Sequence, residues 1–236
     1  MDSEGAIYFN NPISMIPAIS KNYQKGLCDA VDYCIARMAD RVIDEDGCEL
    51  KDAIEKAIKH YAITLGNPTQ SYLTGSELID KHDNRGLPLT GINKKVLFDY
   101  YNNTKTDRAV EQLVCFLAIK SILGNKPAVK TNKKLIAARM AGLLSFKDYP
   151  TNPEGLMKKR TERYYMDELL NDMQVYWNVK IYSHKLKGFY MSLKLDRKQM
   201  AEMSEAKKRL AKIQQIKKEN LEAYNHAKAK FAIASA

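Results

Sequence analysis

The chain has 236 residues, enough for one large or two small domains. Hydrophobic residues make up 45% of it, which is typical of a globular protein, and its apolar runs are too short for a membrane-spanning helix. The net charge of +10 is unevenly spread, because residues 1–104 hold 11 Lys/Arg against 15 Asp/Glu, whereas residues 105–236 hold 27 against 13. This asymmetry indicates a nucleic-acid-binding half joined to a non-binding half, although a basic surface without any partner has the same composition.

The cysteines and the first residues indicate the cellular compartment. None of the four cysteines forms a Cys-x-x-Cys pair: Cys28, Cys34, Cys48 and Cys115. The opening Met-Asp-Ser-Glu-Gly is acidic and lacks the apolar core of a signal peptide. We therefore expect reduced, mostly buried thiols in a cytoplasmic protein.

Residues 1–104 predict a helical domain of unknown role. Two prolines within residues 5–19 predict an extended arm that packs on its own domain or on a second copy. Apolar residues at helical spacing then predict a helix over 20–43, with Ser20 as its cap, and another over 49–65. The acidic stretch 44–47 between them lacks the ligand spacing of an EF-hand, so we expect a turn and no metal site.

Residues 67–91 are rich in Gly, Pro, Asn and Thr and predict only a short helix over 76–81. Asn93 can cap the next helix, which ends near Tyr101. Asn102-Asn103-Thr104 follows at the point where the charge changes sign, and we expect a hinge between two halves there.

A helix, a second helix, a long third helix and a hairpin are predicted next. Thr106 can cap residues 107–123, and Thr131 or Asn132 can cap residues 131–141. Asn152-Pro153-Glu154 predicts the start of a helix that runs to about Trp177 and buries an apolar stripe in its second half. Alternating residues over 178–184 and 189–195 predict a β-hairpin with its turn at 185–188.

Asp196 can cap a last, basic helix that runs to about Ile233. Its apolar residues follow an interrupted heptad, which leaves open whether it packs on its own chain or forms a homodimer. We thus expect a mainly α protein with three parts: residues 1–104, residues 105–195, and a basic C-terminal helix over residues 196–236.

In the order and size of their elements, residues 105–195 resemble the winged helix-turn-helix DNA-binding superfamily. One difference is the link from Gly142 to Thr151, which is longer than the turn of a tight helix-turn-helix. The resemblance implies that the long helix enters the major groove of double-stranded DNA and that the hairpin contacts phosphates.

The expected DNA-binding residues lie near the start of the second helix, in the first half of the long helix and at the hairpin tip. They are Lys133, Lys134, Lys158, Lys159, Arg160, Thr161, Arg163, Tyr164, His184, Lys185 and Lys187. Two of these cations, Lys159 and Arg163, continue the line of the apolar stripe, so either DNA or the acidic half of the chain must compensate the charge at this end of the helix.

No enzyme signature is present, neither a phosphate-binding glycine loop nor a zinc-spaced His/Cys cluster nor a nucleophile elbow, so we expect no catalysis, metal or cofactor. The hypothesis is a double-stranded DNA-binding protein, either a transcription regulator or a replication or maintenance factor of a phage or plasmid. One alternative is an adaptor whose basic half binds a protein partner. Another is an RNA-binding module that stacks bases on tyrosines such as Tyr164, Tyr165, Tyr182 and Tyr190.

Overall fold

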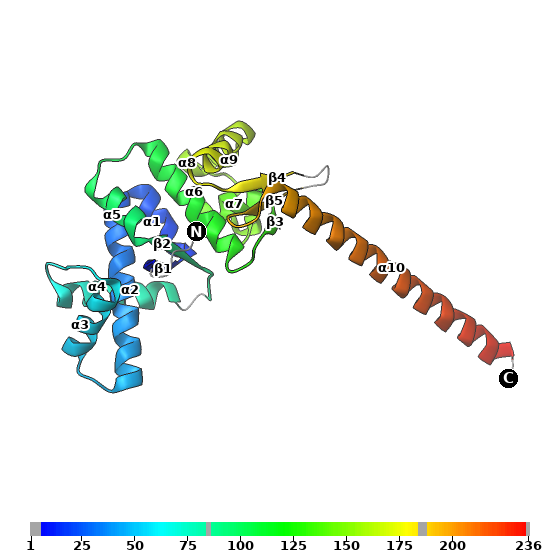
Figure 1. Ribbon diagram of the computed structural model, residues 1–236, viewed down its shortest axis with the longest axis horizontal. Coiled ribbons are helices and arrows are strands. Elements are labelled where there is room, and N and C mark those ends of the chain that lie inside the picture. Colours follow the sequence, from blue (N-terminus) through cyan, green and yellow to red (C-terminus); the bar gives the residue numbers. More distant parts are fainter. Residues whose placement is uncertain (1–5, 84–85, 184–187, 235–236) are drawn as a thin grey trace.

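The computed structural model describes residues 6–83, 86–183 and 188–234, and their side chains except those of 223, 224 and 226–234. The protein is mainly helical, with two small antiparallel sheets and a long C-terminal helix (Figure 1). None of the helices in these ranges is both long enough and apolar enough to cross a membrane.

The N-terminal arm packs on its own chain. Strand β1 (Tyr8–Pro12) pairs antiparallel with β2 (Leu89–Asn93), and a 3-10 turn, η1 (Ile13–Met15), follows it. Phe9 and Ile13 are fully buried, which explains why the arm is fixed. The expectation of an extended arm up to residue 19 is wrong beyond the strand, because Pro17 lies in the first turn of helix α1 (Ile16–Lys21), where proline is tolerated.

Helices α2 (Tyr23–Asp46) and α3 (Leu50–Tyr61) form an antiparallel pair. Asn22, not Ser20, caps α2, and its side-chain oxygen accepts a hydrogen bond from the amide of Lys25 at 3.2 Å. The predicted turn over 44–47 is also wrong, because α2 continues to Asp46 and ends at Gly47, whose φ of +62° favours glycine.

The largest error in the acidic half concerns helix α4 (Pro68–His82), of which only residues 76–81 were predicted as helical. Asn67 caps it and Pro68 occupies its first turn. Gly75 interrupts the pattern because it packs against α2: a β-carbon there would lie 2.1 Å from the carbonyl oxygen of Asp32. This glycine therefore permits close helix packing, where sequence reasoning treated it as a loop residue.

The capping predictions for the next two helices are confirmed. Asn93 accepts the amide of Lys95 at the start of α5 (Lys94–Asn102), and Thr106 accepts the amide of Ala109 at the start of α6 (Asp107–Leu123). Helix α6 then passes through the centre of the protein, and ten of its residues are buried.

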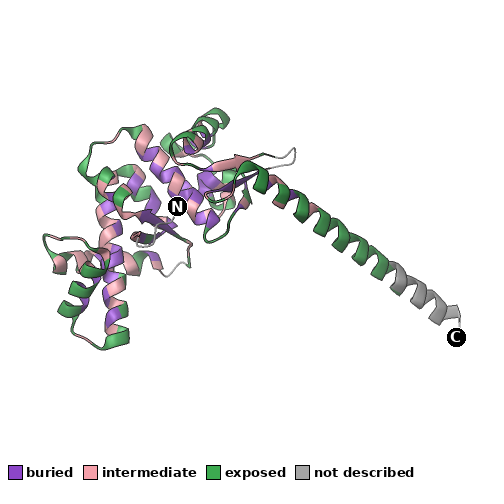
Figure 2. Ribbon diagram, in the orientation of Figure 1, coloured by how far each residue is buried: buried purple, intermediate pink, exposed green. Residues whose placement is uncertain are grey.

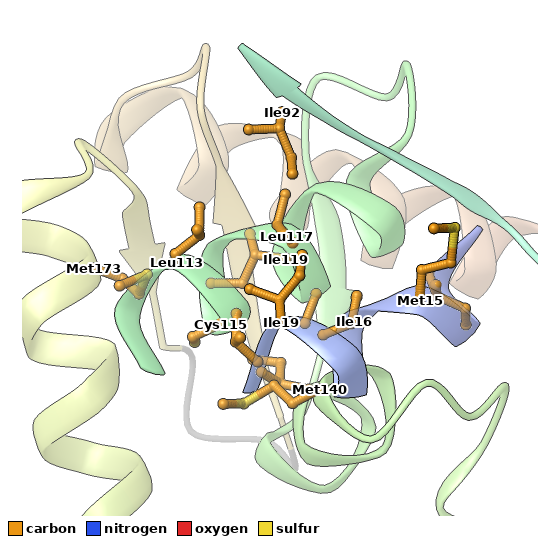
Figure 3. Close-up of a cluster of buried hydrophobic side chains, with 14 of the residues drawn as sticks. Met15, Ile16, Ile19, Ile92, Leu113, Cys115, Leu117, Ile119, Met140 and Met173 are labelled. Atoms are coloured by element: carbon orange, nitrogen blue, oxygen red, sulfur yellow. The ribbon is translucent and has the colours of Figure 1, made fainter. Parts of the chain in front are cut away.

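The main hydrophobic core contains residues from both sides of the predicted boundary at 104. Figure 3 shows α6 side chains such as Leu113 and Leu117 between Ile16 of α1 and Met173, which belongs to a later helix. Ile92 of β2 and Met140 join the same core. The acidic and basic halves therefore share one continuous apolar cluster.

The second sheet contains the predicted hairpin, formed by β4 (Lys180–Tyr182) and β5 (Phe189–Ser192). A third strand that was not predicted, β3 (Val129–Thr131), pairs with the other edge of β5 and gives the order β3-β5-β4. The expected hairpin tip, with His184, Lys185 and Lys187, lies outside the described residues.

Between β3 and β4 lie helix α7 (Lys133–Met140), capped by Asn132 as expected, a 3-10 turn η3 (Phe146–Asp148) and two further helices. The single helix predicted from Asn152 to Trp177 is wrong: a short α8 (Gly155–Lys159) is separated from α9 (Arg163–Tyr176). Gly155 has a φ of +53°, outside the right-handed helical region, so no helix runs through it from Pro153.

The last helix, α10 (Arg197–Ala234), extends away from the rest of the described protein (Figures 1 and 2). As expected, Asp196 caps it, accepting the amide of Gln199 at 2.8 Å. Only its first turns pack on the body, where Met200 and Ser204 are buried near Tyr190 of β5.

Candidate nucleic-acid interface

Helix α9 has one buried and one exposed face. Met166, Leu169, Leu170 and Met173 are buried, as the apolar stripe predicted. In the first turn, the side chain of Arg163 lies at the edge of this stripe and is 85% exposed, and Tyr164, on the opposite side, is 84% exposed. A guanidinium and a phenol ring thus project together into solvent from a helix that the core holds in place.

Arg160, expected among the exposed DNA-binding residues, is 3% exposed and points into the protein. Its Nη2 and its Nε donate to the carboxylate of Glu111 in α6, the latter at 3.1 Å. Further hydrogen bonds run to the hydroxyl of Ser20 at 2.7 Å and to the carbonyl of Met140 at 3.3 Å. Arg160 therefore joins its own segment to α1, α6 and α7 inside the protein, and its guanidinium is not available to DNA in this structure.

Two features explain why the chain departs from a continuous helix here. Glu111 is buried and needs a cation, and an unpaired buried charge is costly. The hydroxyl of Thr161 donates to the carbonyl of Lys158 at 2.7 Å, a local bond that competes with helical geometry. Tyr165 adds a hydrogen bond to Glu111 at 3.1 Å, and burial together with the nearby Glu111 charge raises the pKa of Tyr165 to about 12.

The remaining predicted residues of this region lie at the surface. Lys158 and Lys159 on α8 are exposed, as is Thr161. Lys134 on α7 is exposed, with its ammonium 5.3 Å from the centre of the Phe146 ring. Among these described side chains, the three lysines form no ion pair with a carboxylate, whereas the hydroxyl of Thr161 is already donated to Lys158.

Asp167 connects α7 to α9. Its carboxylate pairs with Lys133, and its Oδ2 lies 3.8 Å from Nε of Arg163. Asp167 and Glu168 are both exposed, so beyond its first turn the exposed face of α9 is not basic. Within the described part of residues 131–176, the exposed cations of the proposed site therefore lie on α8, in the first turn of α9 and at the start of α7.

Sequence reasoning missed Arg139, in the last turn of α7. Its Nε and Nη1 are buried and have no hydrogen-bond partner among the described residues, and burial lowers the pKa of its guanidinium. Buried donors without acceptors cost free energy, so an anionic group that reached this guanidinium would relieve that cost. No periodicity marks this residue, because its type and position are those of an ordinary solvated helix end.

His82 and Asp83 have structural contacts. His82 is 9% exposed, with its Nδ1 2.8 Å from Oγ of Ser14 in η1. Asp83 is hydrogen-bonded to the phenol of Tyr33 and, at 2.8 Å, to the guanidinium of Arg37. Both residues thus join the end of α4 to neighbouring elements. In the ranges that the structure describes, no three His, Cys, Asp or Glu side chains form a metal-binding group.

Comparison of the chain with protein-family models, with curated proteins and with solved structures found no match. The residues of α7, α8 and α9 described above are therefore the basis for a functional assignment.

Proposed function

We propose that this protein binds double-stranded DNA through a winged helix-turn-helix unit formed by α6 to β5. The support is the order of elements: helices α6, α7 and α9, each with a buried face, are followed by the hairpin β4-β5, and β3 joins the hairpin edge. Resemblance in fold is an analogy, so the site itself must carry the functional argument.

The observation that carries the proposal is the pair Arg163 and Tyr164. Both are more than four-fifths exposed at the start of a helix whose other side is fixed in the core. Lys158 and Lys159 precede them, and Lys133 and Lys134 lie on α7. In the proposed complex Arg163 contacts a base edge or phosphate, and the lysines contact the backbone.

Fluorescence anisotropy with the full chain and a labelled duplex tests this proposal. Residues 105–236 alone are unsuitable, because Arg160 bonds to Ser20 and the core crosses residue 104. We expect an affinity that falls steeply between about 50 mM and about 200 mM salt, because phosphate contacts release counterions. Absence of binding at low salt, or tighter binding of single-stranded RNA in the same titration, contradicts the proposal.

The biological role that we propose is transcription regulation, or replication or maintenance of a phage or plasmid. Each role requires a defined site, so selection from a random duplex library should enrich one sequence. Binding without enrichment contradicts these roles while leaving non-specific DNA binding in place.

A second proposal concerns α10. Leu210, Ile213, Ile216 and Leu221 are each at least 45% exposed on this projecting helix. Such a row favours a protein partner, and a second copy of the chain is the partner that we propose.

A further inference from the structure

A cavity of about 300 Å³ lies in the acidic half, between α2, α5 and the segment that joins α3 to α4. It is lined by Leu27, Cys28, Val31, Asp32, Ile63, Thr64, Leu65, Gly66, Ser71, Leu97, Phe98 and Tyr101. Its volume is at the lower end of the range for small-molecule sites. The cavity is separate from the proposed DNA surface, since all its lining residues precede residue 104.

The lining has the composition of a ligand site, mostly apolar with a few polar groups. Leu27 and Leu97 belong to the main core and fix the walls on α2 and α5. Thr64 and Ser71 contribute hydroxyl groups, and Tyr101 contributes a phenol. Only one lining residue carries a full charge near neutral pH, and that residue is Asp32.

Asp32 is half-buried and has a hydrogen bond with Ser71. Among the described residues no cation forms an ion pair with it. The charge of Asp29, one turn earlier on α2, repels it. Burial and this repulsion raise the pKa of Asp32, and the hydrogen bond with Ser71 opposes them, so the carboxylate is partly desolvated and lacks a cation of its own.

We propose that this cavity binds a small molecule with a protonated amine and a compact apolar body, such as an arylalkylamine. The ammonium group pairs with Asp32, and the apolar body fills the space between the aliphatic walls. An anionic ligand is disfavoured because Asp32, which lines the cavity, repels it. A neutral apolar ligand of the same shape leaves the half-buried carboxylate with Ser71 alone and without an ionic partner, which costs affinity.

The test compares three probes of similar shape: 2-phenylethylamine, 2-phenylethanol and 3-phenylpropionate. Each is titrated into the full-length, ¹⁵N-labelled protein at neutral pH and followed by backbone amide chemical shifts. We expect saturable binding of the amine, with shifts concentrated at lining amides such as Gly66 and Leu97. The alcohol should bind about tenfold more weakly or worse, because it lacks the ionic hydrogen bond, and the propionate should bind least.

Asp32→Asn is the matched variant, since it keeps the shape and removes the charge. It should lower the affinity for the amine about tenfold, to that of the alcohol, and leave the alcohol's affinity nearly unchanged. Asp44→Asn is the control, because it removes the same charge from an exposed position near the other end of α2. It should leave all three affinities as they are.

Equal affinities for amine and alcohol, no saturable binding of the amine, or an unaltered amine affinity in Asp32→Asn would each overturn the proposal. If Asp32→Asn does not fold, the comparison of the three probes on the unaltered chain still decides. No DNA is present in this titration, so its result is independent of whether the chain binds DNA.

Discussion

The guanidinium of Arg160 and the carboxylate of Glu111 form a buried, two-point ion pair across 49 residues of sequence. The two side chains are 3% and 5% exposed. Because Arg160 also bonds to Ser20 and to the carbonyl of Met140, this pair joins α1, α6 and α7 to the segment before α9. The pair thereby fixes the position from which Arg163 and Tyr164 project.

Arg160→Ala should lower the free energy of unfolding by about 3–5 kcal/mol, because it leaves Glu111 buried without a partner. Urea unfolding followed by circular dichroism measures the change. Arg163→Ala is the matched control three residues later. Since Arg163 is largely exposed, its removal should change stability by no more than about 0.5 kcal/mol.

A double variant separates the cost of an unpaired charge from the loss of contacts. Arg160→Met with Glu111→Leu removes both charges and should recover part of the stability lost in Arg160→Ala. Equal stabilities for Arg160→Ala and Arg163→Ala would show that the ion pair does not hold this segment.

The sequence predicted the features that depend on neighbouring residues. Thr106, Asn93 and Asp196 cap helices because each side chain bonds to an amide two or three positions later. The buried stripe of α9 and the hairpin β4-β5 likewise follow from short periodicities. The sequence pattern is thus sufficient to predict an element when the contacts that form it are between residues close together in the chain.

Features set by distant contacts were not predictable. By local pattern Arg163, and not Arg160, continues the apolar stripe, yet Glu111, far along the chain, makes Arg160 the buried one and leaves Arg163 exposed. Gly75 has a loop-forming residue type, yet its function is to let α4 approach Asp32 of α2. The three residues of β3 are too few for a periodic signal, and only their pairing with β5 defines the strand.

Arg163→Ala should weaken binding to the preferred duplex by about 1–3 kcal/mol if the guanidinium contacts a base edge. Anisotropy on the selected sequence and on a scrambled duplex distinguishes the two kinds of contact. A loss confined to the selected sequence indicates base recognition, and an equal loss on both indicates phosphate contact. Unchanged affinity on both duplexes removes Arg163 from the interface.

Lys158→Ala with Lys159→Ala should weaken binding to all duplexes alike. If each lysine neutralises one phosphate, the slope of log affinity against log salt should decrease by about 0.9 for each. Both side chains are exposed, so circular dichroism and melting should be unaffected. An unchanged slope would place α8 outside the DNA contact surface.

The thiols should divide into two classes. Burial raises the pKa of Cys34 from 9.0 to about 12 and also raises the pKa of Cys115 and of Cys28, but Cys28, like Cys48, is only partly buried. A disulfide reagent should therefore react promptly with at most Cys28 and Cys48 in the folded chain, and with all four after unfolding. Prompt reaction of Cys115 in its native state would contradict this packing of α6.

The raised pKa of Cys34 also predicts how the stability of the protein depends on pH. A group whose pKa is raised by folding contributes stability that is complete below its unfolded value and is lost as pH rises through its folded value. For Cys34 that range runs from 9.0 to about 12. Burial also raises the pKa of Tyr100 to about 12, in the same direction. Urea midpoints should therefore decrease steadily above about pH 9, and constant midpoints would contradict the burial.

The exposed apolar row on α10 leads to the last prediction. At 100° per residue, Ile213 and Ile216 fall on the side away from Met200 and Ser204, which pack on the body, whereas Leu210 continues the line of the partly buried Met203. All three side chains are nevertheless at least 45% exposed, so the described part of the chain leaves this row uncovered. A long helix gains most of its stability from packing, so we expect two copies to associate along this row.

Sedimentation velocity should show a dimer that Leu210→Glu with Ile213→Glu converts to a monomer, because four buried carboxylates per dimer would lack partners. Gln215→Glu is the control, since it adds charge on the opposite side of the helix, and it should leave the dimer intact. Arg209 and Lys217 flank the row, so two helices bring like charges together, and added salt should strengthen association. DNA binding should respond to salt in the opposite direction, which separates the two interactions. A chain that stays monomeric at every salt concentration contradicts the proposed dimer.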